Sequence, residues 1–100
     1  MHGDMVMMGQ ESDTVRLFLE SMIFTKGRET FTQISVLRFT ITSVKEEAGK
    51  TVVSGDQQVV ASHVVKGLVR FTTQRQALEV FNRFARQFGF RPLAIPKELK

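Results

Sequence analysis

The sequence predicts an α+β fold: a curved antiparallel meander of three to four strands with one C-terminal amphipathic helix packed across it. Three observations support this class. Stretches with apolar residues at every second position come first, and a single helical stretch follows them. Polar segments containing glycine separate these stretches. A length of 100 residues with 42% hydrophobic residues suffices for one ordinary core.

The chain is predicted to contain one α+β domain over residues 14–91, flanked by two irregular segments. Residues 1–13 are polar, contain glycine and have no period, so we expect a disordered N-terminal arm, although four of the five methionines lie there. Residues 92–100 carry both prolines, at positions 92 and 96, and are expected to form an extended C-terminal tail.

Three strands are predicted, over residues 14–25, 31–44 and 57–72. The first is apolar on both faces. In the second, the apolar residues change parity near Val36-Leu37, which predicts a bulge or bend. In the third, the odd positions form an apolar inner face that includes Val59, Ala61, His63, Val65, Val69 and Phe71.

The connections are predicted from glycine and charge. Gly27 indicates a turn over residues 26–29, and residues 45–50 form a charged surface loop typical of a hairpin connection. The stretch 51–54 is compatible with a continuation of the sheet before a turn at Gly55-Asp56. Gly67 is a candidate bulge or close-approach point in the third strand.

The helix is predicted over residues 73–88, where apolar residues form a broad stripe at helical spacing. Thr73 can cap its N-terminus, with Gln76 at the spacing of a capping box. Gly89 lies where a left-handed C-cap belongs, and Phe90 can fold back onto Ala85.

Composition excludes several classes of protein. Without cysteine the chain has no disulfide framework, thiolate metal site or cysteine nucleophile. The N-terminus lacks the features of a secretory signal, and the longest apolar run is only a few residues. We therefore expect a cytoplasmic protein with no membrane contact.

The charge is distributed unevenly along the chain. Residues 1–56 carry six basic and eight acidic residues, a net charge of −2, whereas residues 57–100 carry eight basic and two acidic residues, a net charge of +6. This asymmetry favours an anionic partner such as nucleic acid. The alternative is an ordinary solubilising surface.

The sequence contains none of the common enzyme motifs, so a non-enzymatic protein without cofactor, metal or catalytic residues is expected. Ser62 and His63 are adjacent on a strand and must point to opposite faces, so they cannot act together. A lone His63 among valines is interpreted as structural. Glu46 and Glu47 are expected in a solvated loop, where paired-carboxylate catalysis has no support.

The candidate binding residues are basic and lie on the third strand, the helix and the segment after it: Lys66, Arg70, Arg75, Arg83, Arg86 and Arg91. Arginine predominates among them, as suits phosphate recognition. The alternative is a solvated helix surface, because Glu79 has i, i+4 spacing to both Arg75 and Arg83.

Two functions follow. The first is a nucleic-acid-binding accessory protein that contacts phosphates through these residues. The second is a protein-interaction or assembly module, either a homo-oligomer such as a homodimer or a complex with another protein, formed through an apolar sheet face that one helix cannot cover. Phe18, Phe24 and Phe39 belong to the core or a subunit interface, or alternatively stack on bases beside Arg16.

Overall fold

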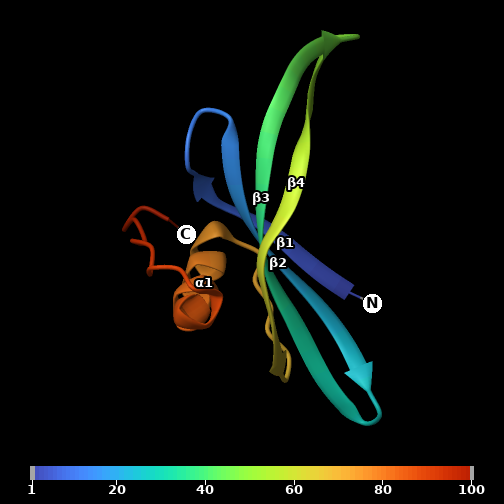
Figure 1. Ribbon diagram of the computed structural model, residues 1–100, viewed down its shortest axis with the longest axis vertical. Helices are drawn as coiled ribbons and strands as arrows, with labels where there is room; N and C mark the ends of the chain where they lie inside the picture. Colours follow the sequence, from blue (N-terminus) through green and yellow to red (C-terminus); the bar gives the residue numbers. More distant parts are fainter. Residues whose placement is uncertain (1, 100) are drawn as a thin grey trace.

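The computed structural model describes residues 2–99 and contains one four-stranded antiparallel sheet and one helix (Figure 1). The strands β1 (His2–Gln10), β2 (Val15–Lys26), β3 (Glu29–Glu47) and β4 (Lys50–Lys66) follow one another in the order β1-β2-β3-β4. Helix α1 (Gln74–Phe88) packs against this open meander. The predicted fold class is confirmed.

The prediction of a disordered arm over residues 1–13 is wrong for the part that the structure describes, and Met1 lies outside it. β1 pairs with β2 from His2 opposite Ile23 to Gln10 opposite Arg16. Met8 is 3% exposed and belongs to the core. The segment has no regular apolar alternation, so its strand conformation depends on pairing with β2 rather than on a local signal.

Two short turns connect β2, β3 and β4. Gly27, with φ 65°, and Arg28 connect β2 to β3, as the glycine predicts. Ala48 and Gly49 connect β3 to β4 with φ 50° and 76°, the two positive values that a type I′ turn requires. The loop predicted over residues 45–50 is therefore a hairpin connection, but its residues outside positions 48 and 49 are paired strand.

The turn predicted at Gly55-Asp56 is wrong, because both residues lie within β4. Gly55 is opposite Ile41, and a Cβ atom at position 55 would collide with the carbonyl oxygen of Thr40 and lie 2.8 Å from Cζ of Phe39. Glycine is required here for a close approach within the sheet rather than for a turn.

The third predicted strand extends too far, because β4 ends at Lys66 and residues 67–72 leave the sheet. Gly67 has φ 104°, which ends the extended conformation. The hydroxyl of buried Thr32 donates to the carbonyl of Gly67 at 2.8 Å and accepts from the amide of Val69 at 3.0 Å. Hydrogen bonds of the Thr32 side chain thus replace the strand pairing that the alternation of apolar residues predicted for residues 67–72.

A bulge occurs opposite Val36-Leu37, but in β4 rather than in β3, the strand for which the parity change predicted it. Val36 lies opposite Ala61 and Leu37 opposite Val59, so Val60 of β4 is the extra residue. The register of β3 with β2 is unbroken across the same positions. The bulge therefore lies in β4 and reverses the parity of that strand.

Helix α1 has the predicted ends. The Thr73 hydroxyl accepts from the amide of Gln76 at 3.2 Å, while Oε1 of Gln76 accepts from the amide of Thr72 at 2.8 Å rather than from that of Thr73. Gly89 has φ 80°, and the amide of Phe90 donates to Ala85 at 2.9 Å.

The core lies between α1 and one face of the sheet. It includes Leu19, Ile34 and Val36 from β2 and β3. Its remaining buried residues come from β1, from residues 67–73 between β4 and α1, and from the helix: Met8, Phe71, Ala77, Leu78, Val80, Phe81, Ala85 and Phe88. Residues 92–99 form neither helix nor strand, but Ile95 and Leu99 pack against this core. Within residues 2–99, no helix covers the opposite sheet face.

Candidate interaction surfaces

The structure disperses the six predicted phosphate-binding residues. Lys66 ends β4, and its Nζ lies 3.2 Å from Oε1 of Glu29. Nε and Nη2 of Arg70 each lie 3.3 Å from one carboxylate oxygen of Asp4. Both cations therefore already have an anionic partner within the chain.

Arg75 holds the C-terminal segment. Its Nε donates to the carbonyl of Leu99 at 2.7 Å, and its Nη2 donates to that of Pro96 at 3.1 Å. Nη1 also lies 3.8 Å from Oε1 of Glu79, at the predicted i, i+4 spacing. Arg75 has a structural role that its position in the sequence does not reveal.

The other three basic residues lie away from the sheet. Arg83 and Arg86 are on the exposed side of α1, and Arg91 follows the helix. The guanidinium of Arg83 lies 6.0 Å from the ring centroid of Phe84. Among residues 2–99, none of these three arginines has an ion-pair partner. They form the one part of the predicted set that remains available to an anion.

The strand register separates two faces of the sheet, because residues directly opposite one another in neighbouring strands share a face. Leu19 and Val36 are paired and belong to the core beneath α1. The next pair along the same strands, Phe18 and Leu37, must point to the other side. We call that side the open face; its apolar residues are Met5, Met7, Phe18, Met22, Phe24, Phe31, Leu37, Phe39, Ile41, Val44, Val53, Val59 and Val64.

The open face exposes large apolar side chains on both edge strands. Met5 and Met7 on β1 are 56% and 45% exposed, and Val59 and Val64 on β4 are 57% and 56% exposed. Leu37, in the middle of the sheet, is almost fully buried beneath its neighbours. A broad apolar surface therefore meets solvent on the side opposite the helix.

Aromatic rings occupy the two central strands of the open face. Phe24 and Phe31 lie on paired positions, with ring centroids 5.6 Å apart and planes inclined by 20°. With Lys26 and Val64 they line a hollow of about 220 Å³. Phe18 and Phe39, which the sequence also marks as interface or stacking candidates, share this face.

A polar row crosses the middle of the open face. Glu20 lies opposite Ser35, and Ser35 lies opposite Ser62. The hydroxyl oxygens of the two serines are 3.0 Å apart, and Nε2 of Gln33 donates to Ser62 at 2.9 Å. Glu20 has no ion-pair partner among the residues that the structure describes.

The sequence did not assign Met5, Met7 and Val59 to the open face. The two methionines lie in the segment expected to be disordered. Val59 shares the parity of His63 and Val65 in the sequence, but the extra residue Val60 moves it to the opposite side. Comparing which positions are apolar before and after Val60 could have indicated that the strand changes face. Only the pairing with β3 locates the bulge at that residue.

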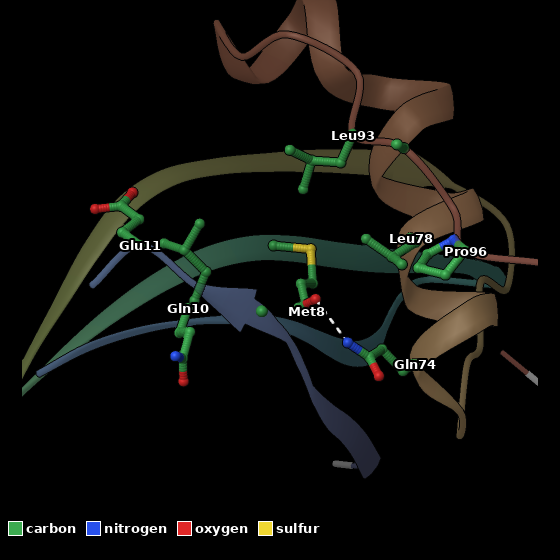
Figure 2. A pocket seen from close by; sticks show the side chains of 10 residues that line it. Met8, Gln10, Glu11, Gln74, Leu78, Leu93 and Pro96 are labelled. Atoms are coloured by element: carbon green, nitrogen blue, oxygen red, sulfur yellow. Dashed lines mark hydrogen bonds between the residues drawn. The ribbon is translucent and has the colours of Figure 1, made fainter. Parts of the chain in front are cut away.

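A second hollow lies on the helix side of the sheet, with a volume of about 310 Å³ (Figure 2). Met8, Leu78 and Leu93 provide apolar walls, and Nε2 of Gln74 donates to the carbonyl of Met8 at 2.9 Å. The charged residue in its lining, Glu11, already binds Arg38 at 3.1 Å. The hollow offers apolar contacts but no available acid, base or nucleophile.

His63 and Ser62 lie on opposite faces of the sheet. The His63 ring faces the helix, with its centroid 5.0 Å from that of Phe88, while Ser62 belongs to the polar row of the open face. Across residues 2–99, no group of three or more His, Cys, Asp or Glu residues could hold a metal ion.

Comparison with protein families, with curated proteins and with solved structures finds no match to this chain. Within the described part of the chain, the helix is too short and too polar to cross a membrane.

Proposed function

We propose that this protein is a non-enzymatic assembly module that self-associates through its open face. The observation that carries the proposal is the apolar surface of that face, which extends across all four strands and which α1 does not cover. Large exposed apolar surface is rare on proteins that work as monomers. A second copy presents the same surface, so each apolar face would cover the other.

The dimensions of the protein also support association. A folded monomer of 11.4 kDa typically exposes about 5,800 Å², whereas this chain exposes 6,944 Å². Its radius of gyration is 15.1 Å, against about 13 Å for a compact chain of this length. The excess surface is roughly 1,100 Å², and a standard interface covers about 800 Å² per partner.

The charges of the open face favour a protein partner over a polyanion. Arg16, Lys26 and Lys66 provide three cations, and Glu20, Glu29 and Glu46 provide three anions on the same side. Lys66 is already paired with Glu29. A face with balanced charge and exposed methionine and valine side chains suits an apolar protein surface better than phosphates.

The test is the mass of the protein in solution, measured by sedimentation velocity over a wide range of concentration. We expect the wild type to form a dimer of about twice the 11.4 kDa chain mass. Val59→Asp places a charge on the open face and should give a monomer. Leu68→Asp is the matched control, because Leu68 is 62% exposed but lies outside that face.

A wild type that remains monomeric at every concentration would refute the proposal. So would equal behaviour of Val59→Asp and Leu68→Asp, because the open face would then have no special role in association.

A second candidate function is nucleic-acid binding as an accessory protein. The observation that favours it is that Arg83, Arg86 and Arg91 are exposed and have no ion-pair partner among the described residues. These arginines would contact phosphates, so affinity should fall steeply with salt. Binding to mixed single- and double-stranded oligonucleotides at two salt concentrations tests this, with Arg83→Ala/Arg86→Ala as the variant and Lys45→Ala/Lys50→Ala as the control on the distant hairpin.

A further inference from the structure

We infer that two copies pack open face against open face around a two-fold axis at Phe18, so that Arg16 of each copy lies beside Glu20 of the other. This inference rests on the proposed self-association and adds its symmetry and the residues that specify it. Arg16, Phe18 and Glu20 alternate along β2 and therefore point to the same side.

Phe18 is at the centre of this arrangement. It lies in a row with Met7 on β1, Leu37 on β3 and Val59 on β4, so it belongs to an apolar band that crosses the whole sheet. Arg16 and Glu20 are each two residues away, or about 7 Å along the strand in opposite directions. The Cα atoms of the two residues are therefore about equally far from Phe18 along the strand.

When two identical sheets pack with their strands aligned, a two-fold axis between them has two possible directions. The two-fold axis lies in the plane between the sheets and runs either along the strands or across them. An axis along β2 places the two copies of that strand parallel, with Arg16 near Arg16 of the second copy and Glu20 near Glu20. An axis across β2 at Phe18 makes the strands antiparallel and places Arg16 near Glu20 twice.

Electrostatics selects the antiparallel arrangement. Covering Glu20 without a cation would leave a carboxylate in an apolar interface, which is strongly unfavourable. The parallel arrangement would also bring like charges together. The antiparallel arrangement gives Glu20 the cationic partner that it lacks among the residues described within its own chain.

Arg16 is held in place before a partner binds. Its Nη1 donates to the carbonyls of Ser12 at 2.9 Å and Asp13 at 3.0 Å, within the turn that precedes β2. Neither of these bonds uses Nε or Nη2. A guanidinium fixed by backbone contacts loses less conformational entropy when it pairs with a carboxylate.

Charge reversal tests the axis through the affinity of self-association. Glu20→Arg and Arg16→Glu should each weaken dimerisation at least tenfold, because each creates two like-charge contacts. An equimolar mixture of the two variants should form a heterodimer with nearly wild-type affinity, because the mixture contains only opposite-charge contacts. Lys45→Glu is the control: it reverses an exposed charge near the β3–β4 turn, outside the open face, and its dimerisation should match that of the wild type.

A cross-linking experiment tests the position of the axis without requiring that the Arg16→Glu variant folds. The chain has no cysteine, so Phe18→Cys introduces a single thiol. Packed sheets lie about 10 Å apart, and a bis-maleimide spanning that distance should join two copies at position 18. Met22→Cys, four residues from the axis, should react with the reagent but give little dimer.

The outcomes separate the inference from the proposed function. If Val59→Asp abolishes association but the mixed charge variants fail to restore it, or position 22 cross-links as well as position 18, the axis is wrong and the open-face interface stands. A monomeric wild type overturns both.

Discussion

Arg70, between the end of β4 and the start of α1, binds Asp4 of β1 through two parallel contacts of 3.3 Å. The same carboxylate accepts from the amide of Phe71 at 3.4 Å. The Asp4 side chain is only 13% exposed. This contact joins residues 66 positions apart and fixes the N-terminal strand to the chain just before α1.

Removing this carboxylate should destabilise the fold. We expect Asp4→Ala to lower the free energy of unfolding by about 2 kcal/mol, because a charge-assisted pair and a backbone hydrogen bond are lost together. Glu29→Ala removes an exposed ion pair with Lys66 and should cost less than about 1 kcal/mol. Urea unfolding measures both, and equal losses would contradict a special role for Asp4.

Alanine substitutions at Met8 and Met7 test whether β1 is a packed strand of the fold. Met8 is buried in the core, whereas neighbouring Met7 is on the open face and 45% exposed. Met8→Ala should cost about 2–4 kcal/mol through lost burial and a cavity. Met7→Ala should cost less than about 1 kcal/mol in the monomer. If both variants melt like the wild type, residues 2–10 do not form a packed strand.

Gly55 is expected to tolerate no side chain. Gly55→Ala forces a Cβ atom against the Thr40 carbonyl and the Phe39 ring, and should cost about 1–3 kcal/mol. Gly9→Ala is the matched control, because no atom lies within 4 Å of its Cβ position; we expect its stability to be within about 1 kcal/mol of the wild type. Thermal denaturation compares the two variants. If Gly55 lay in a turn, the methyl group would have room and Gly55→Ala would be as stable as Gly9→Ala.

The Thr73 cap should contribute to helix stability through its hydroxyl. Thr73→Ala removes the acceptor for the Gln76 amide and should cost about 1 kcal/mol. Thr73→Ser keeps the hydroxyl and should retain most of that stability. Chemical denaturation followed by circular dichroism tests this, and equal destabilisation by the two substitutions would show that the cap is not the cause.

The helix and the hairpin turn after β2 were predictable because their signals are local. A cap at Thr73, an apolar stripe and Gly89 occur within 17 consecutive residues, and Gly27 marks its own turn. Each depends on the conformation of a few neighbouring residues.

The candidate surfaces were only partly predictable, because charge in the sequence does not reveal which cations find partners. Arg70 and Arg75 have the composition of a phosphate site, yet one binds Asp4 and the other the carbonyls of Leu99 and Pro96. Their partners lie 21 or more residues away in the chain. Of the six predicted residues, only Arg83, Arg86 and Arg91 are exposed and without an ion-pair or backbone-carbonyl partner among the described residues.

The sequence by itself determined an α+β meander, a correctly capped helix and a surplus of apolar strand residues. Tertiary structure alone decided that residues 2–10 form a strand, that β4 stops at Lys66, and that Val59 lies on the open face. The physical reason is that these three features depend on partners distant in sequence: β2 pairs with β1, Thr32 binds the chain beyond Gly67, and β3 places the bulge at Val60.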